Sequence, residues 1–119
     1  MTVECTLIIG EIWPPQEEPA YLKTIATIDL GGISQKLQIN RLPKTGKAFY
    51  IYGLDGNIKF FVDDYDQKLV AHAPATVLKA LAKDGKLNLR CAIAEALLNN
   101  IVTVWMEEAK NLAVVLFWH

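Results

Sequence analysis

The chain has 119 residues, of which 52% are hydrophobic and 21% charged, and its net charge is −1. This length predicts a single domain over residues 1–119 with a substantial core. The near-neutral charge excludes a protein held to nucleic acid or to an anionic membrane by its overall charge. Such an apolar composition indicates either strands that are covered on both faces or apolar surface that meets another subunit.

The first half of the chain has the pattern of a β-sheet. Apolar and polar residues alternate in the first segment, and turn residues separate it from similar segments further on. Gly31 and Gly32 predict a two-residue hairpin turn, and the later LDGN sequence predicts another. From the second strand on, we expect an antiparallel meander, with Leu22, Ala26, Ile28 and Leu30 on one face of that strand. The expected strands cover residues 3–9, 20–30, 33–39, 48–52 and 58–62.

Residues 42–46 read LPKTG, a match to the LPxTG signal by which sortases attach proteins to bacterial cell walls. The match lies in mid-chain, and Gly53, Asp55 and Gly56 interrupt the following residues long before a membrane span of about 20 apolar residues is reached. No Lys or Arg precedes Lys23, so the basic start of a signal peptide is missing. We therefore expect a surface loop here, and a cytoplasmic protein with no membrane partner.

The second half of the chain has helical signals. Pro74 suits a first helical turn and Gly85 suits the left-handed position after a helix, which predicts a helix between them. Asn88 is a candidate N-cap for a second helix over 87–99, although the apolar residues there also fit a strand. The β-branched and aromatic tail predicts strands over 101–105 and 112–118. The expected class is α+β: a mainly antiparallel sheet, with an N-terminal β-meander and C-terminal strands, and one or two helices packed on one face.

The two cysteines do not indicate a metal site or a redox site. Cys5 and Cys91 lack the CxxC spacing of a metal or redox pair. In a chain without an export signal, we expect them to be buried thiols.

An acidic cluster gives the first alternative function. Asp63, Asp64 and Asp66 are the densest set of hard oxygen ligands in the sequence, and with a divalent metal they would suit an enzyme. His72 would be its general base. The simpler interpretation is a solvated turn, with His72 as a cap or a surface residue. His119 ends the sequence given, and we expect it to be held too loosely for catalysis.

A basic and aromatic segment over 36–52 gives the second alternative, a weak binder of single-stranded nucleic acid. Cations for the backbone and aromatic rings for base stacking are what such proteins use. The simpler interpretation is an ordinary solvated hairpin whose aromatic residues fill the core. The residues concerned are Lys36, Arg41, Lys44, Lys47, Phe49, Tyr50 and Tyr52.

The tail from Leu112 to Trp118 has no polar face, because all seven residues are apolar. Such a strand is either covered on both sides within the subunit or in contact with another chain. We expect self-association through it, with an interface that includes Leu112, Val115, Phe117 and Trp118. The other interpretation is an inner strand under a helix.

Together these features predict a small cytoplasmic binding or interaction module that works as a homodimer or larger homo-oligomer. No motif indicates a reaction, so we do not expect an enzyme, and we expect no cofactor and no metal site. An apolar small molecule is a further expected partner, held between the sheet and the helices. The expected lining residues of that site are Phe49, Tyr50, Tyr52, Phe60, Phe61 and Trp105.

Overall fold

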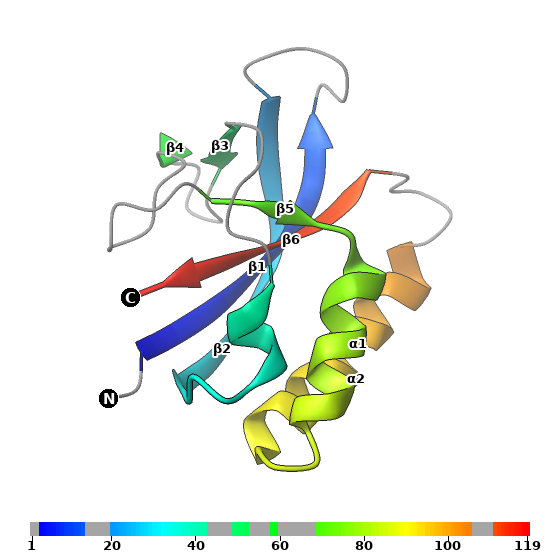
Figure 1. The fold of residues 1–119 in the computed structure, drawn as a ribbon. Coiled ribbons are helices and arrows are strands. Elements are labelled where there is room, and N and C mark those ends of the chain that lie inside the picture. The colour runs from blue at the N-terminus through cyan, green and yellow to red at the C-terminus, as the bar shows by residue number, and fades with distance from the viewer. Residues whose placement is uncertain (1–2, 14–19, 43–48, 53–57, 60–68, 106–110) are drawn as a thin grey trace.

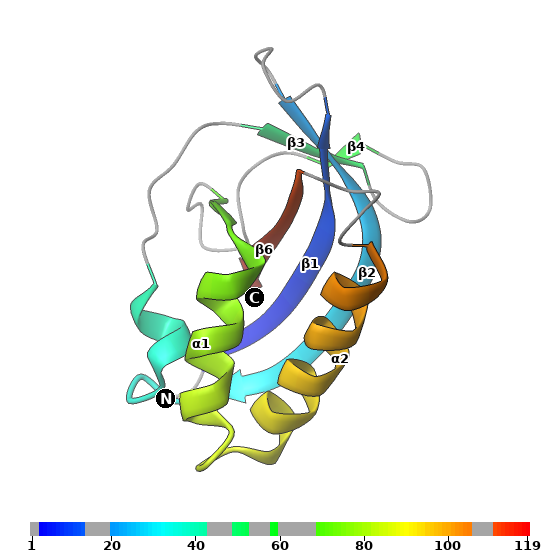
Figure 2. The same ribbon diagram turned by 90° about the vertical axis from the view of Figure 1, so that its right-hand side faces the viewer.

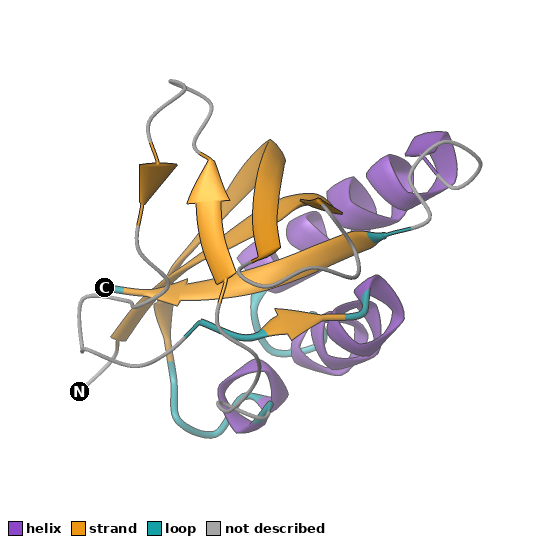
Figure 3. Cartoon of the chain, turned by 90° about the horizontal axis from the view of Figure 1, so that it is seen from above, coloured by secondary structure: helices purple, strands orange, loops and turns teal. Residues whose placement is uncertain are grey.

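The structure is a computed structural model that describes residues 3–13, 20–42, 49–52, 58–59, 69–105 and 111–119. It contains one six-stranded sheet with the strand order β4-β3-β2-β1-β6-β5, and two helices that lie side by side across one face of it (Figures 1 and 2). Viewed from above, the helices gather to one side of the twisted strands (Figure 3). The predicted α+β class is confirmed. The elements are β1 (Val3–Trp13), β2 (Ala20–Ile33), the 3-10 helix η1 (Gln38–Arg41), β3 (Phe49–Tyr52), β4 (Ile58–Lys59), β5 (Ala71–His72), α1 (Pro74–Asp84), α2 (Leu89–Trp105) and β6 (Leu112–Trp118).

The long antiparallel pair β1–β2 forms the centre of the sheet. In β1, the residues Cys5, Leu7 and Ile9 point into the core under the helices, so the alternation predicted over 3–9 is confirmed. The strand continues beyond that segment to Trp13.

The hairpin predicted at Gly31-Gly32 is wrong, because β2 runs through both glycines to Ile33. Gly31 has a φ of 68° and lies opposite Cys5 at a register shift. It is therefore part of a β-bulge within the strand and does not reverse the chain. The third strand expected over 33–39 is also wrong. A turn and the 3-10 helix η1 replace it, and two backbone N–H groups of η1 bond to the carboxylate of Asp84.

A second register shift explains why the predicted common face of β2 is wrong at Leu22. Ile9 pairs with Ala26 and Gly10 pairs with Thr24, so the residue between them has no opposite partner. An extra residue in one strand reverses which face the following side chains occupy. Leu22 therefore packs on the outer face of the sheet, whereas Ala26 packs against the cluster under the helices.

The expected continuous meander is wrong between β2 and β3, because these two strands pair in parallel. The antiparallel order expected for the next two strands is confirmed, since β3 and β4 pair antiparallel with Ile51 opposite Lys59. The LDGN turn predicted between them lies outside the described residues. The LPKTG segment lies outside the described residues from Pro43 onward, so its predicted loop stays a prediction.

Helix α1 begins at Pro74 and ends at Asp84, as predicted. The left-handed conformation expected at Gly85 is wrong, since its φ is −61°. Glycine leaves room at the close turn between the two helices, because a Cβ atom there would make a tight contact, 3.1 Å from the Cα atom of Ala92.

Helix α2 begins after Asn88, whose side-chain oxygen accepts a hydrogen bond from the N–H of Cys91 at 3.1 Å, so the predicted N-cap is confirmed. The helix runs on to Trp105, and the strand expected over 101–105 is wrong. Ile101 and Val102 pack against the main core from within the helix. Burial on that face outweighs the preference of β-branched residues for strands.

Among the described residues, the buried apolar side chains form two clusters, one on each face of the sheet. The larger cluster lies between the sheet and the helices, and the smaller one lies on the outer face. Strand β6 is an inner strand between β1 and β5, and it supplies both clusters, with Val114 on the helical face and Val115 on the outer face. No helix among the described residues is both long enough and apolar enough to cross a membrane.

Candidate functional site

Most residues of the predicted ligand site lie where the structure describes no side chain. For Phe49, Tyr50 and Tyr52 only the backbone of β3 is described, and Phe60 and Phe61 lie outside the described residues. Trp105 ends α2 and is half-buried. The predicted apolar ligand site therefore stays a prediction.

Most residues of the two alternative functions also have no described side chain. Asp63, Asp64 and Asp66 lie outside the described residues, and no group of three or more His, Cys, Asp or Glu side chains suited to a metal ion occurs in the part of the chain that the structure describes. Of the four basic and three aromatic residues named for this segment, only Lys36 and Arg41 have described side chains, and both are exposed.

The interface expected on β6 needs a correction. Val115 has no exposed surface within the chain and packs with Leu22, Leu69 and Ala113. Trp118 is also buried. Because Val115 is already covered, a charged residue in its place would unfold the subunit instead of releasing a folded monomer.

The other two residues expected at that interface, Leu112 and Phe117, are half-buried. Each packs at the edge of one of the two core clusters, Leu112 under the helices and Phe117 on the outer face. Both side chains thus serve the fold of the subunit, as an inner strand requires.

His72 is buried in β5, where it pairs with Val114 of β6. Burial disfavours the charged imidazolium and lowers the pKa of His72 below its ordinary value. The residue is neither the surface histidine nor the helix cap that the sequence suggested, because the N-cap of α1 is Ala73.

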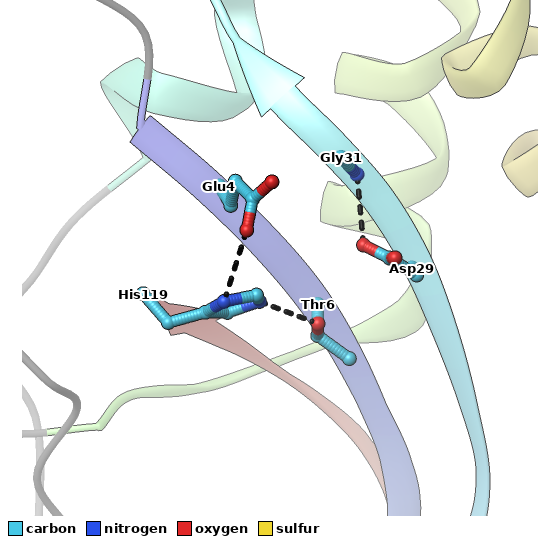
Figure 4. A network of polar contacts seen from close by, with 5 residues as sticks. All are labelled: Glu4, Thr6, Asp29, Gly31 and His119. Atoms are coloured by element: carbon cyan, nitrogen blue, oxygen red, sulfur yellow. Dashed lines mark hydrogen bonds and ion pairs between the residues drawn. The ribbon is translucent and has the colours of Figure 1, made fainter.

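His119 is held more firmly than the sequence suggested. Its N–H and C=O both pair with the backbone of Glu4, at 2.9 and 3.0 Å. Its imidazole Nε2 lies 2.9 Å from the hydroxyl oxygen of Thr6, and its Nδ1 lies 3.4 Å from the carboxylate of Glu4 (Figure 4). The expectation of a loosely held side chain is therefore wrong.

This order of carboxylate, imidazole and hydroxyl is also that of hydrolase triads. Here, however, the Glu4 side chain is 61% exposed, so water competes for the imidazole. The network therefore lacks the buried carboxylate that orients the base in such triads. It ties His119 to the start of β1, and we assign it no catalysis.

The outer flank of α2 carries the largest exposed apolar side chains among the described residues. Leu89, Ile93, Leu97 and Val104 of α2 are exposed by 75%, 51%, 46% and 72%, and Leu87, just before the helix, is exposed by 83%. Residues four or seven apart share one side of a helix, so the spacing of 89, 93, 97 and 104 places the four helical residues in one stripe. We call these five residues the α2 stripe.

Contacts at the start of α2 show which way the stripe faces. Ala92 adjoins Gly85, on the side of α1, whereas Arg90 lies against Gly31 of β2. Leu97 follows Arg90 by two turns and so lies on the same side as Arg90. The stripe therefore occupies the flank of α2 that is turned away from α1. Figure 2 shows α1 and α2 side by side, with β2 running next to α2.

A shallow cleft of about 550 Å³ adjoins the first turn of α2. Leu87 and Leu89 belong both to this cleft and to the stripe, so the stripe ends at a cleft whose other lining is largely polar. The lining residues of the cleft are Glu4, Leu30, Gly31, Gly32, Leu87, Asn88, Leu89 and Arg90.

The sequence contains the apolar spacing of this surface, but it does not show whether that side of the helix is buried or exposed. The spacing of Leu89, Ile93 and Leu97 favours a helix, and an apolar face of a helix is normally taken to be its core face. In the structure, Cys91, Ala94 and Leu98 form the core face instead. Leu89, Ile93 and Leu97 point outward.

Comparisons with protein-family models, with curated proteins and with solved structures give no match to this chain.

Proposed function

We propose that this protein is an interaction module that works as a homodimer, and that the two copies bind each other through the α2 stripe. The observation that carries the proposal is the set of four large exposed apolar side chains on one flank of α2, together with the exposed Leu87 just before the helix. Single exposed apolar residues are ordinary on protein surfaces, but several large ones on one flank of a helix favour an interaction surface, although the exposed Asn100 lies among them.

The size of the exposed surface supports this proposal. The five exposed fractions, from 46% at Leu97 to 83% at Leu87, together amount to roughly three whole side chains. Complete burial of one such side chain is worth about 1.5–3 kcal/mol, so each free monomer leaves about 5 kcal/mol or more of hydrophobic stabilisation unused. A second copy can cover this surface because a twofold pair buries the same patch on both subunits.

The proposal includes a cytoplasmic location. Cys5 and Cys91 are both buried thiols, which suits a reducing compartment.

A pair of variants tests the proposal. Ile93→Glu combined with Leu97→Glu places two charges in the middle of the stripe, at positions exposed enough to accept them without loss of the fold. Asn99→Glu is the matched control, since Asn99 is exposed on the same helix but outside the stripe. In sedimentation velocity over the micromolar range, we expect the parent and the control to be dimers and the double variant to be a folded monomer. A parent that remains monomeric over that range would overturn the proposal.

A further inference from the structure

Beyond the proposed function, we propose that the connection between α1 and α2 docks on the surface of an anionic lipid bilayer. This connection, residues 83–90, lies at one end of the molecule in both side views, and we call it the tip (Figures 1 and 2). It carries Leu87 and Leu89, the two most exposed large apolar side chains among the described residues, at 83% and 75%. They form the end of the α2 stripe, whereas the dimer variant changes Ile93 and Leu97 in its middle.

Positive charge flanks the two leucines of the tip. Lys83 and Lys86 precede them in the chain and Arg90 follows them, and all three side chains are exposed. The one acidic residue of the tip, Asp84, is 2% exposed and is occupied by hydrogen bonds to η1. Anionic lipids attract such a cluster of cations, and the apolar side chains between the cations can enter the boundary below the headgroups.

Other charged residues near the tip come from distant parts of the chain. Lys36 is exposed and lies two residues before Gln38, whose N–H bonds to Asp84 at 2.7 Å, so a further cation lies close to the end of α1. Exposed acidic side chains also lie nearby, but they belong to the strands: Glu4 lines the cleft beside the leucines, and Asp29 bonds to a backbone N–H of β2. Within the tip itself, the exposed charges are all positive.

The backbone of the tip suits a surface with little water. The four consecutive N–H groups from Gly85 to Asn88 donate to carbonyl oxygens of α1, at 2.7, 3.4, 2.9 and 2.9 Å. The side chain of Asn88 in turn accepts the N–H of Cys91 at 3.1 Å. Backbone groups without partners are costly in apolar surroundings, and these five N–H groups have theirs. The turn therefore presents the leucines on a support that needs no water at these groups.

The leucines favour a lipid surface over other anionic partners. Nucleic acid is held mainly by contacts between cations and phosphates, which gives two projecting leucines no role. At a bilayer surface, apolar side chains reach about 5–10 Å into the boundary, while long Lys and Arg side chains keep their charges among the headgroups. The cytoplasmic leaflet carries anionic lipid, which agrees with the proposed location. The expectation of no membrane partner came from the lack of a spanning segment, and surface contact does not need one.

Vesicle sedimentation tests the proposal. The parent should bind vesicles of phosphatidylcholine that contain about 30% phosphatidylserine, and should bind vesicles of phosphatidylcholine alone at least tenfold more weakly. Leu87→Ala combined with Leu89→Ala should lower the partition coefficient on the anionic vesicles by tenfold or more. Lys83→Gln combined with Lys86→Gln should lower it by roughly 30-fold, on the anionic vesicles only.

Two matched variants control for changes outside the tip. Val104→Ala shortens a side chain that is 72% exposed at the other end of α2. Lys79→Gln removes an exposed cation one helical turn before Lys83. Both controls should bind the anionic vesicles within about threefold of the parent. All of these variants should keep the circular dichroism spectrum of the parent, because every changed side chain is exposed.

A fluorescent probe locates the contact. Both native thiols are buried, so the environment-sensitive dye NBD can be attached to a single new thiol in Leu87→Cys or in Val104→Cys. On addition of the anionic vesicles, we expect the emission to shift to the blue for the label at position 87. The emission of the label at position 104 should not change.

The outcomes separate this inference from the proposed homodimer. A parent that does not bind the anionic vesicles would overturn the inference, and so would a leucine double variant that binds as the parent does. Tighter binding to a single-stranded oligonucleotide than to vesicles, unchanged in the leucine variant, would show a nucleic-acid surface and overturn it as well. A parent that sediments as a monomer yet binds vesicles would overturn only the homodimer, and a dimeric parent that does not bind vesicles would overturn only this inference.

Discussion

Asp84 is the most consequential buried charge among the described residues, and its removal tests the account of the fold. The residue ends α1 and is 2% exposed. Its two carboxylate oxygens accept hydrogen bonds from the N–H groups of Gln38 and Ile39, at 2.7 and 2.8 Å. These bonds join the end of α1 to η1, a segment more than 40 residues earlier in the chain.

We expect Asp84→Ala to destabilise the protein by about 2–4 kcal/mol. Each hydrogen bond to a charged group is worth about 1.5–3 kcal/mol, and loss of the carboxylate leaves two N–H groups without it. Part of that loss is offset because the carboxylate itself no longer has to be buried. For a domain of this size, the expected change lowers Tm by roughly 10 °C.

Urea denaturation followed by circular dichroism measures the free energy of unfolding of the variant. Asp29→Ala is the matched control, because Asp29 is exposed and accepts one backbone N–H at 2.8 Å; its loss should cost less than about 1 kcal/mol. Hydrogen exchange adds a local measurement, since the amides of Gln38 and Ile39 should lose protection in Asp84→Ala and keep it in the control. If Asp84→Ala stayed within about 0.5 kcal/mol of the parent, the reasoning would be refuted.

Two further predictions concern stability. The lowered pKa of His72 means that, as the pH falls, the unfolded chain binds a proton before the folded chain does. The free energy of unfolding should therefore fall below about pH 6.5, by up to about 1.4 kcal/mol per pH unit. Denaturation at pH 7.5 and 5.5 should show a smaller loss of stability for His72→Gln than for the parent, and an equal loss would contradict the assignment. Gly10→Ala should cost about 3 kcal/mol or more, because its Cβ would lie 2.3 Å from the carbonyl oxygen of Lys23. Gly31→Ala meets only the movable end of Arg90 and should cost less, about 1–2 kcal/mol for its positive φ; thermal unfolding of the two variants in the reverse order would contradict this.

The sequence by itself determined the elements whose signals are local. Alternation in β1 depends only on which residues follow one another, and the helix start at Pro74 and the cap at Asn88 depend on one or two residues each. The apolar run of β6 likewise predicted a strand. For these elements the preferences of neighbouring residues agree, so no distant contact was needed to decide them.

Only the tertiary structure decided the rest, because the deciding contacts join residues far apart in sequence. The glycine pair after residue 30 could turn or bulge, and pairing with β1 together with the bonds from Asp84 selected the bulge and η1. Packing against the core selected helix for residues 101–105. The candidate site depended on the same kind of decision. Helix α2 is apolar on two sides, and the position of α1 and β2 beside it determined that Leu98 is buried and Leu97 is left exposed.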